Sequence, residues 1–211
     1  MAYKDSKLYI RCPVCGNVRT ELIHNTLNYY VCHDCGWQSN FPDKNGKKTL
    51  DIFSADTESS CLSNLFPYKF DFYMSKYGID FLKPIKCLSM ESFIQGLKIM
   101  DPSLQREFME NFSGLNCIKL KFTIEDWRKD GFVYLNGNKI DRRSINYSDI
   151  ITAAYDCLYE TNKIFREIAI PYASKHYLIH SIGKDNASET LLTEDEYISQ
   201  LYRLIQRYKE M

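Results

Sequence analysis

The sequence lacks both a net charge and a long hydrophobic run. Basic and acidic residues number 27 each among 211, so composition alone does not indicate a nucleic-acid or membrane surface as partner. The chain contains no stretch of about 18 consecutive apolar residues, which predicts that no helix spans a membrane. The first residues, MAYKDSKLYIRCPVC, also lack the apolar core of a secretory signal.

Regularly distributed cysteines, which would indicate a secreted disulfide framework, are absent as well. Four of the eight cysteines form two close pairs, and the other four stand singly among apolar neighbours (Cys61, Cys87, Cys117 and Cys157). Isolated cysteines of this kind behave as small buried hydrophobic residues. The pattern favours a reducing compartment, and we expect a cytoplasmic protein.

The paired cysteines predict a metal site. They read Cys12-Pro-Val-Cys15 and Cys32-His-Asp-Cys35, and a glycine follows each pair. Two Cys-x-x-Cys turns supply the four thiolates of a tetrahedral structural Zn²⁺ site. β-forming residues before Cys32 predict a hairpin between the pairs. We therefore predict a β-hairpin zinc ribbon over residues 1–48, with a redox dithiol and an iron–sulfur site as alternatives.

The remaining residues, 49–211, predict a mostly helical α+β domain with a small sheet. Apolar periodicity and capping residues favour helices over 89–99, 102–112, 148–168 and 193–208, with Pro171 marking the end of the third. The segments 122–140 and 176–182 read as strands, and Asn136-Gly137 supplies a turn in the first. A capping box begins the last helix at Thr193.

The helix predicted over 89–99 carries a polar stripe. At ~100° per residue, Glu91, Gln95 and Lys98 fall within about 60° of one another. Periodicity alone favours the interpretation that these side chains form the solvated face of an amphipathic helix. A functional stripe is the alternative.

Two motifs connect this stripe with a known family. The segments SCLSNLFPYKF (60–70) and SMESFIQGLK (89–98) resemble those of the NADAR family, the YbiA-like N-glycosidases. Looser similarity continues through DWRKDGFVYLNG, NKIFRE and LIHSIGKDNASETLLTEDEY, so the resemblance covers about residues 53–208. It implies a YbiA-like α+β domain that cleaves the N-glycosidic bond between a ribose and a base or amine.

The resemblance also implies catalytic roles for two residues. Because the transition state is oxocarbenium-like, a carboxylate at the anomeric carbon stabilises positive charge or activates water, and Glu91 is the candidate. A buried amine with a lowered pKa attacks the opened sugar and forms a Schiff base, and Lys98 matches the family's lysine.

Further side chains are candidates for substrate binding. Gln95 is placed to hold ribose hydroxyls, the loop before the helix offers polar groups, and aromatic faces offer stacking surfaces, although Trp127 is equally consistent with a core position. Asp156 is a second possible carboxylate and His180 a possible general acid, although a helix flank and a core histidine are the simpler interpretations. The substrate-binding candidates are Ser63, Asn64, Phe66, Gln95, Trp127, Asp156 and His180.

Arg142 and Arg143 are possible phosphate ligands or an exposed loop pair.

The family implies two substrate classes, and the zinc ribbon favours one of them. ADP-ribose attached to guanine in nucleic acid suits a protein with a module that docks nucleic acid. The other class is a ribosylamino-pyrimidine phosphate of riboflavin biosynthesis. A third hypothesis is a non-catalytic module that binds NAD or ADP-ribose. In each case the expected partner is an ADP-ribose or ribosyl-phosphate compound.

Overall fold

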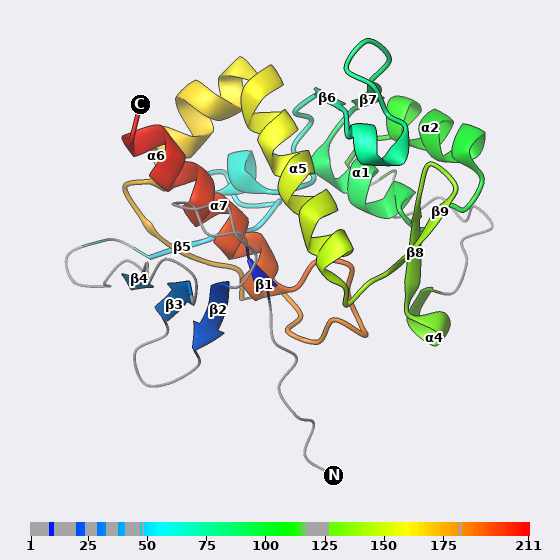
Figure 1. Cartoon of the computed structure of the whole chain (residues 1–211). Coiled ribbons are helices and arrows are strands. Elements are labelled where there is room, and N and C mark those ends of the chain that lie inside the picture. Colours follow the sequence, from blue (N-terminus) through cyan, green and yellow to red (C-terminus); the bar gives the residue numbers. More distant parts are fainter. Residues whose placement is uncertain are drawn as a thin grey trace.

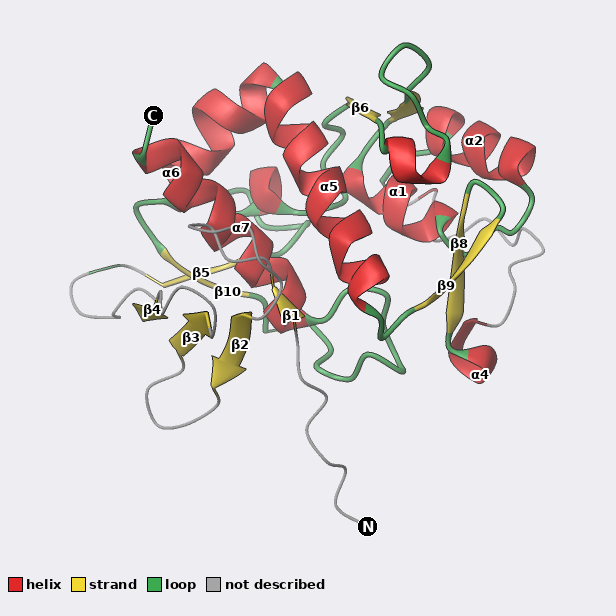
Figure 2. Cartoon of the chain, viewed as in Figure 1, coloured by secondary structure: helices red, strands yellow, loops and turns green. Residues whose placement is uncertain are grey.

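The computed structural model describes most of the larger domain and parts of the N-terminal region. The backbone is described at 9–10, 20–23, 29–32 and 38–40, and the chain is described at 47, 49–114, 116, 127–181 and 183–211. Within these ranges the protein is an α+β structure in which helices dominate and the strands are short (Figures 1 and 2). No helix of this described part is both long and apolar enough to cross a membrane.

Two long helices, α5 (Ile145–Thr161) and α7 (Glu194–Lys209), pack against each other at the centre of the domain (Figure 1). Each begins at an N-cap whose side chain accepts a backbone hydrogen bond, Ser144 for α5 and Thr193 for α7. Glu196 completes a reciprocal capping box at Thr193, which confirms that prediction. The apolar faces of both helices are buried, so packing adds to the local capping in stabilising them.

The chain after α5 differs from the prediction of one continuous helix to residue 168. α5 ends at Thr161, and the side chain of Asn162 accepts a hydrogen bond from Phe165 N (2.9 Å). Helical structure resumes at Lys163 and continues without a break through η3 (Phe165–Ala169, a π-helical turn) and α6 (Ile170–Ala173). The prediction that Pro171 marks a helix end is wrong, because helical structure runs from η3 through Pro171 to Ala173.

A second pair of helices, α1 (Met90–Gly96) and α2 (Pro102–Asn111), lies close to the positions predicted for it. Ser89 caps α1 through a reciprocal bond with Ser92, and Asp101 caps α2. Buried Gln105 then ties the end of α1 to the next strand, because its amide donates to Gly96 O (2.9 Å) and Tyr134 O (2.8 Å). These bonds fix the turn that carries Lys98.

The described strands of the larger domain form three separate two-stranded sheets. The first is parallel, β5 (Thr49–Asp51) with β10 (Tyr177–Ile179), and the others are antiparallel, β6 (Phe70–Phe72) with β7 (Ile85–Cys87) and β8 (Phe132–Leu135) with β9 (Asn138–Asp141). Asn136 and Gly137 join β8 to β9 at φ of 48° and 78°, which confirms the predicted turn.

Three short helices complete the described domain. They are η1 (Ser60–Leu62), η2 (Ser75–Tyr77) and α4 (Trp127–Asp130). The segment predicted as strand-like over 122–140 therefore contains α4 as well as β8 and β9, and its first residues lie outside the described ranges.

In the N-terminal region the described backbone forms an antiparallel sheet in the order β1-β2-β3-β4. Its strands are β1 (Tyr9–Ile10), β2 (Thr20–Ile23), β3 (Tyr29–Cys32) and β4 (Gln38–Asn40). β2 and β3 occupy the segment expected to form a hairpin. The side chains of the predicted zinc ligands, Cys12, Cys15, Cys32 and Cys35, lie outside the described residues, and the zinc site stays a prediction.

Candidate functional site

A cavity of about 290 Å³ lies between α1, α4, His180, the segment 183–192 and the start of α7. This volume is near the lower end of the range for ligand pockets. Six of the nine catalytic or substrate-binding candidates from the sequence line it, whereas Ser63, Phe66 and Asp156 do not. The lining residues are Asn64, Glu91, Ile94, Gln95, Lys98, Trp127, Arg128, His180, Gly183, Lys184, Glu189, Thr190, Leu191, Leu192 and Tyr197.

The polar stripe of α1 forms one wall of this cavity as a connected line of side chains. Gln95 Nε2 donates to Glu91 Oε1 (2.8 Å), and Lys98 Nζ donates to Gln95 Oε1. Lys98 lies just after the helix, in a turn closed by a bond from its backbone N–H to Gln95 O (3.2 Å). All three side chains are partly buried. The stripe therefore faces a cavity and is not a fully solvated surface.

Burial in this wall shifts the pKa values of both ionisable groups toward neutrality. Desolvation raises the pKa of Glu91 above its usual value, and the hydrogen bond from Gln95 and the charge of Lys98 oppose that rise. Desolvation and the nearby Arg128 guanidinium lower the pKa of Lys98, while Glu91 opposes the change. A carboxyl group that holds a proton more readily and an amine that releases one more readily thus share one wall.

Asn64 connects the loop after η1 to this wall. Its backbone carbonyl accepts a hydrogen bond from Glu91 N (2.9 Å), and its Oδ1 accepts one from the buried Tyr155 hydroxyl (2.7 Å). The neighbouring candidates have other contacts: Ser63 Oγ accepts from Leu65 N (3.2 Å), and the ring of Phe66 lies 4.5 Å from that of Tyr68. Asn64 is therefore the residue of this loop whose side chain reaches the cavity and is also fixed in orientation.

His180 lies on another wall with a defined tautomer. Its Nδ1 is 2.7 Å from Ile52 O, and because a carbonyl only accepts, Nδ1 carries a proton. In the neutral ring Nε2 is then an acceptor. The ring packs edge-on against Tyr197 (5.3 Å between centroids), and the backbone N–H donates to Glu194 Oε1 (3.1 Å).

α4 and the segment 183–192 contribute residues that the sequence analysis did not single out. The Arg128 guanidinium lies 5.0 Å from the centre of the Trp127 ring, and Arg128 Nε donates to Glu189 O (3.3 Å). Lys184 Nζ lies 3.7 Å from the Glu189 carboxylate. Trp127 is 3% exposed, so it is buried and lines the cavity at the same time. Arg128 directly follows Trp127 in the sequence, and this position next to a binding candidate was the signal that could have identified it.

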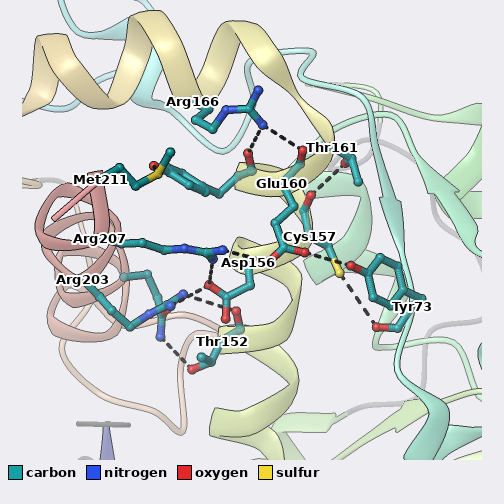
Figure 3. A network of polar contacts seen from close by, with 12 residues as sticks. Tyr73, Thr152, Asp156, Cys157, Glu160, Thr161, Arg166, Arg203, Arg207 and Met211 are labelled. Atoms are coloured by element: carbon teal, nitrogen blue, oxygen red, sulfur yellow. Dashed lines mark hydrogen bonds and ion pairs between the residues drawn. The ribbon is translucent and has the colours of Figure 1, made fainter. Parts of the chain in front are cut away.

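Asp156 occupies a different place, in an ion network between α5 and α7 (Figure 3). Its Oδ1 lies 2.6 Å from Arg203 Nη1 and 3.3 Å from Arg207 Nη1. Arg207 also pairs with Glu160 (3.0 Å), which accepts a hydrogen bond from the Tyr73 hydroxyl (2.8 Å). The contacts of Asp156 therefore fasten the two helices together, in agreement with the simpler interpretation of this residue.

Arg142 also supports the fold and does not line the cavity. It is 3% exposed, and its guanidinium makes two bonds with the Glu196 carboxylate (2.9 and 2.6 Å). Its Nε donates to Thr190 O (3.3 Å). Arg143, by contrast, is exposed. The buried arginine thus holds the cavity-lining segment against α7.

Fold and cavity define an α+β domain with a polar, partly buried pocket, and sequence comparison assigns it to a family. Residues 58–206 match the family described as Bacteriophage protein GP30.3. The match spans well over half of the chain and includes every residue of the pocket, so the protein belongs to this family. Comparisons with curated proteins and with solved structures gave no match.

Proposed function

We propose that the pocket hydrolyses the N-glycosidic bond of an ADP-ribosyl adduct, with ADP-ribosylated guanine in nucleic acid as the substrate. The observation that carries the proposal is the Glu91–Gln95–Lys98 line on one wall of the cavity. Two ionisable groups with pKa values shifted toward neutrality are the arrangement that acid–base and nucleophilic catalysis requires. The NADAR resemblance of the same residues supports this choice of reaction.

In the proposed reaction Glu91 acts at the anomeric carbon. As the C1′–N bond breaks, its electron pair moves to the base nitrogen and positive charge develops on the sugar. The ionised carboxylate stabilises that charge, and its raised pKa makes it able to accept a proton from the attacking group and pass it to the departing base nitrogen. Gln95, which donates to Glu91 Oε1, holds the carboxylate in place.

Lys98 provides a covalent route. Its lowered pKa increases the fraction of neutral amine, which attacks C1′ as the base leaves. Opening of the sugar ring then gives an imine between Nζ and C1′. Water adds to this imine, the C1′–N bond to lysine breaks, and ADP-ribose and the free amine are released. If the covalent route does not operate, Glu91 activates water directly.

The predicted zinc ribbon supports the nucleic-acid form of the substrate. A structural Zn²⁺ held by Cys12, Cys15, Cys32 and Cys35 would build a module of the type that docks nucleic acid. Removal of residues 1–48 should then weaken action on an ADP-ribosylated oligonucleotide and spare a small soluble N-glycoside. Equal loss on both substrates would assign the ribbon to folding.

The test compares three substrates by mass spectrometry: an oligonucleotide with ADP-ribosylated guanine, NAD and a ribosylamino-pyrimidine phosphate. Release of ADP-ribose and restored guanine supports the proposal, and exclusive cleavage of the pyrimidine phosphate would move the activity to the riboflavin-type substrate. Binding without cleavage of any of them would make the domain a binding module.

Two variants test the catalytic wall against exposed controls. Glu91→Gln and Lys98→Ala should each reduce the rate about 10²–10⁴-fold and keep the fold. Glu107→Gln and Lys86→Ala alter exposed residues outside the cavity and should retain full rate.

Borohydride should trap the imine on Lys98. Full activity of Lys98→Ala, or a trapped adduct elsewhere, would refute the covalent route.

A further inference from the structure

The cavity has more positive than negative charge among its described lining residues. Lys98, Arg128 and Lys184 are cationic, whereas Glu91 and Glu189 are anionic. Glu189 pairs with Lys184 at 3.7 Å, and both side chains of this pair are more than half exposed. Among the described lining residues, Lys98, Arg128 and Glu91 are therefore the charges that form no ion pair, and two of the three are cations.

Arg128 has no carboxylate partner within the described chain. Its side chain donates to the backbone carbonyl of Glu189 and lies over the ring of Trp127. Its guanidinium is near enough to Lys98 to disfavour the charged form of that amine. Two like charges beside a cavity repel each other, and an anion bound between or beside them would relieve that repulsion.

Trp127 adds an unpaired donor to the same wall. Its Nε1 is buried and makes no hydrogen bond with any described residue, although the ring lines the cavity. An indole N–H only donates, and buried donors are normally paired. The donor therefore has no acceptor among the described residues, and a ligand oxygen in the cavity that the ring lines would supply one.

From these three observations we propose that Trp127, Arg128 and Lys184 form an anion subsite that binds a phosphate of a nucleotide ligand. The subsite belongs to α4 and the segment 183–192, whereas Glu91 and Lys98 come from α1 and the turn after it. The phosphate is thus held apart from the groups assigned to bond cleavage. This inference deepens the proposed function and rests on it for the ADP-ribosyl identity of the ligand.

Calorimetry with the full chain tests the subsite. ADP-ribose and adenosine are titrated into the wild type, Arg128→Gln and Lys129→Gln. Lys129 is the matched control because it is exposed, carries the same charge and lies next to Arg128 on α4, yet does not line the cavity. Loss of a charge-assisted hydrogen bond should weaken ADP-ribose binding about 10-fold or more in Arg128→Gln. Adenosine binding, and all binding by Lys129→Gln, should change less than about twofold.

Nuclear magnetic resonance supplies a readout specific to the tryptophan donor. The chain has two tryptophans, Trp37 and Trp127, so Trp37→Phe leaves one indole N–H signal. ADP-ribose should move this signal downfield and adenosine should not. Trp127→Phe keeps an aromatic side chain and should lower ADP-ribose affinity by several-fold.

The outcomes separate the subsite from the enzyme. Binding of ADP-ribose that is equal in Arg128→Gln and in the wild type, or an indole signal that does not move at saturation, would overturn the subsite. Failure of the wild type to bind both ADP-ribose and inorganic pyrophosphate would overturn it too. Arg128-dependent binding without any hydrolysis would keep the subsite and reject the enzyme. Hydrolysis that is unaffected by Arg128→Gln would keep the enzyme and reject the subsite.

Discussion

Replacement of Arg142 tests the energetic role of the buried ion pair behind the pocket. Arg142 is 3% exposed and Glu196 is 16% exposed. The arginine makes two bonds to the carboxylate and one to Thr190 O, and its guanidinium lies 4.3 Å from the Tyr147 ring centre. Glu196 Oε2 also accepts from Thr193 N (2.8 Å). The pair therefore joins the start of α7 to a segment that lines the cavity.

The two single variants should differ because they leave different groups unpaired. Glu196→Gln leaves a nearly inaccessible guanidinium without its carboxylate, which should cost about 3–5 kcal/mol of unfolding free energy. Arg142→Met leaves a carboxylate that retains some solvent and the Thr193 bond, so we expect a smaller loss of about 1–3 kcal/mol. Arg143→Met, the exposed neighbour, should change stability by no more than about 0.5 kcal/mol.

The double variant Arg142→Met/Glu196→Gln completes the cycle. Because no unpaired buried charge remains, its loss should be less than the sum of the two single losses by about 1–3 kcal/mol. Urea unfolding followed by circular dichroism measures all four values. Additive losses, or an Arg142→Met variant as stable as Arg143→Met, would refute the argument that this pair acts as a buried unit.

Three further predictions concern the cavity and the metal. The pKa of Glu91 is raised from 4.5 in the folded state, so its contribution to stability is present below pH 4.5 and is lost as pH rises through the folded-state pKa. The melting temperature of Glu91→Gln relative to wild type should therefore increase from pH 4 to pH 7. Melting temperatures that change in parallel with pH in the two proteins would contradict this. In Gly183→Ala the new Cβ would lie 2.8 Å from His180 O and 2.9 Å from Glu194 Cβ, so thermal unfolding should reveal a loss of about 1–3 kcal/mol, and an unchanged melting temperature would show that the loop adjusts. Cys12→Ser should abolish an otherwise stoichiometric zinc content, measured by metal analysis, and leave the unfolding of the larger domain intact; retained zinc would remove Cys12 from the ligand set.

Local signals were sufficient for the helices that have their own caps and for the tight turn. Thr193 and Glu196 mark the start of α7 because their reciprocal bonds form within one helical turn. Asn136 and Gly137 mark the β8–β9 turn because few other residues tolerate positive φ. The end of α5 was missed, because Asn162 and Pro171 are compatible with either a stop or a new helical turn.

The sequence by itself also placed Glu91, Gln95 and Lys98 on one stripe, since their angular spacing follows from helical geometry. It did not decide whether that stripe faces solvent. Only the tertiary structure did so, by bringing α4 and the segment 183–192 over it. Likewise, Arg142 and Asp156 are reactive types in the sequence but hold helices in the fold. Charge and hydrogen-bonding partners come from residues distant along the chain, and no local pattern encodes which of them will meet.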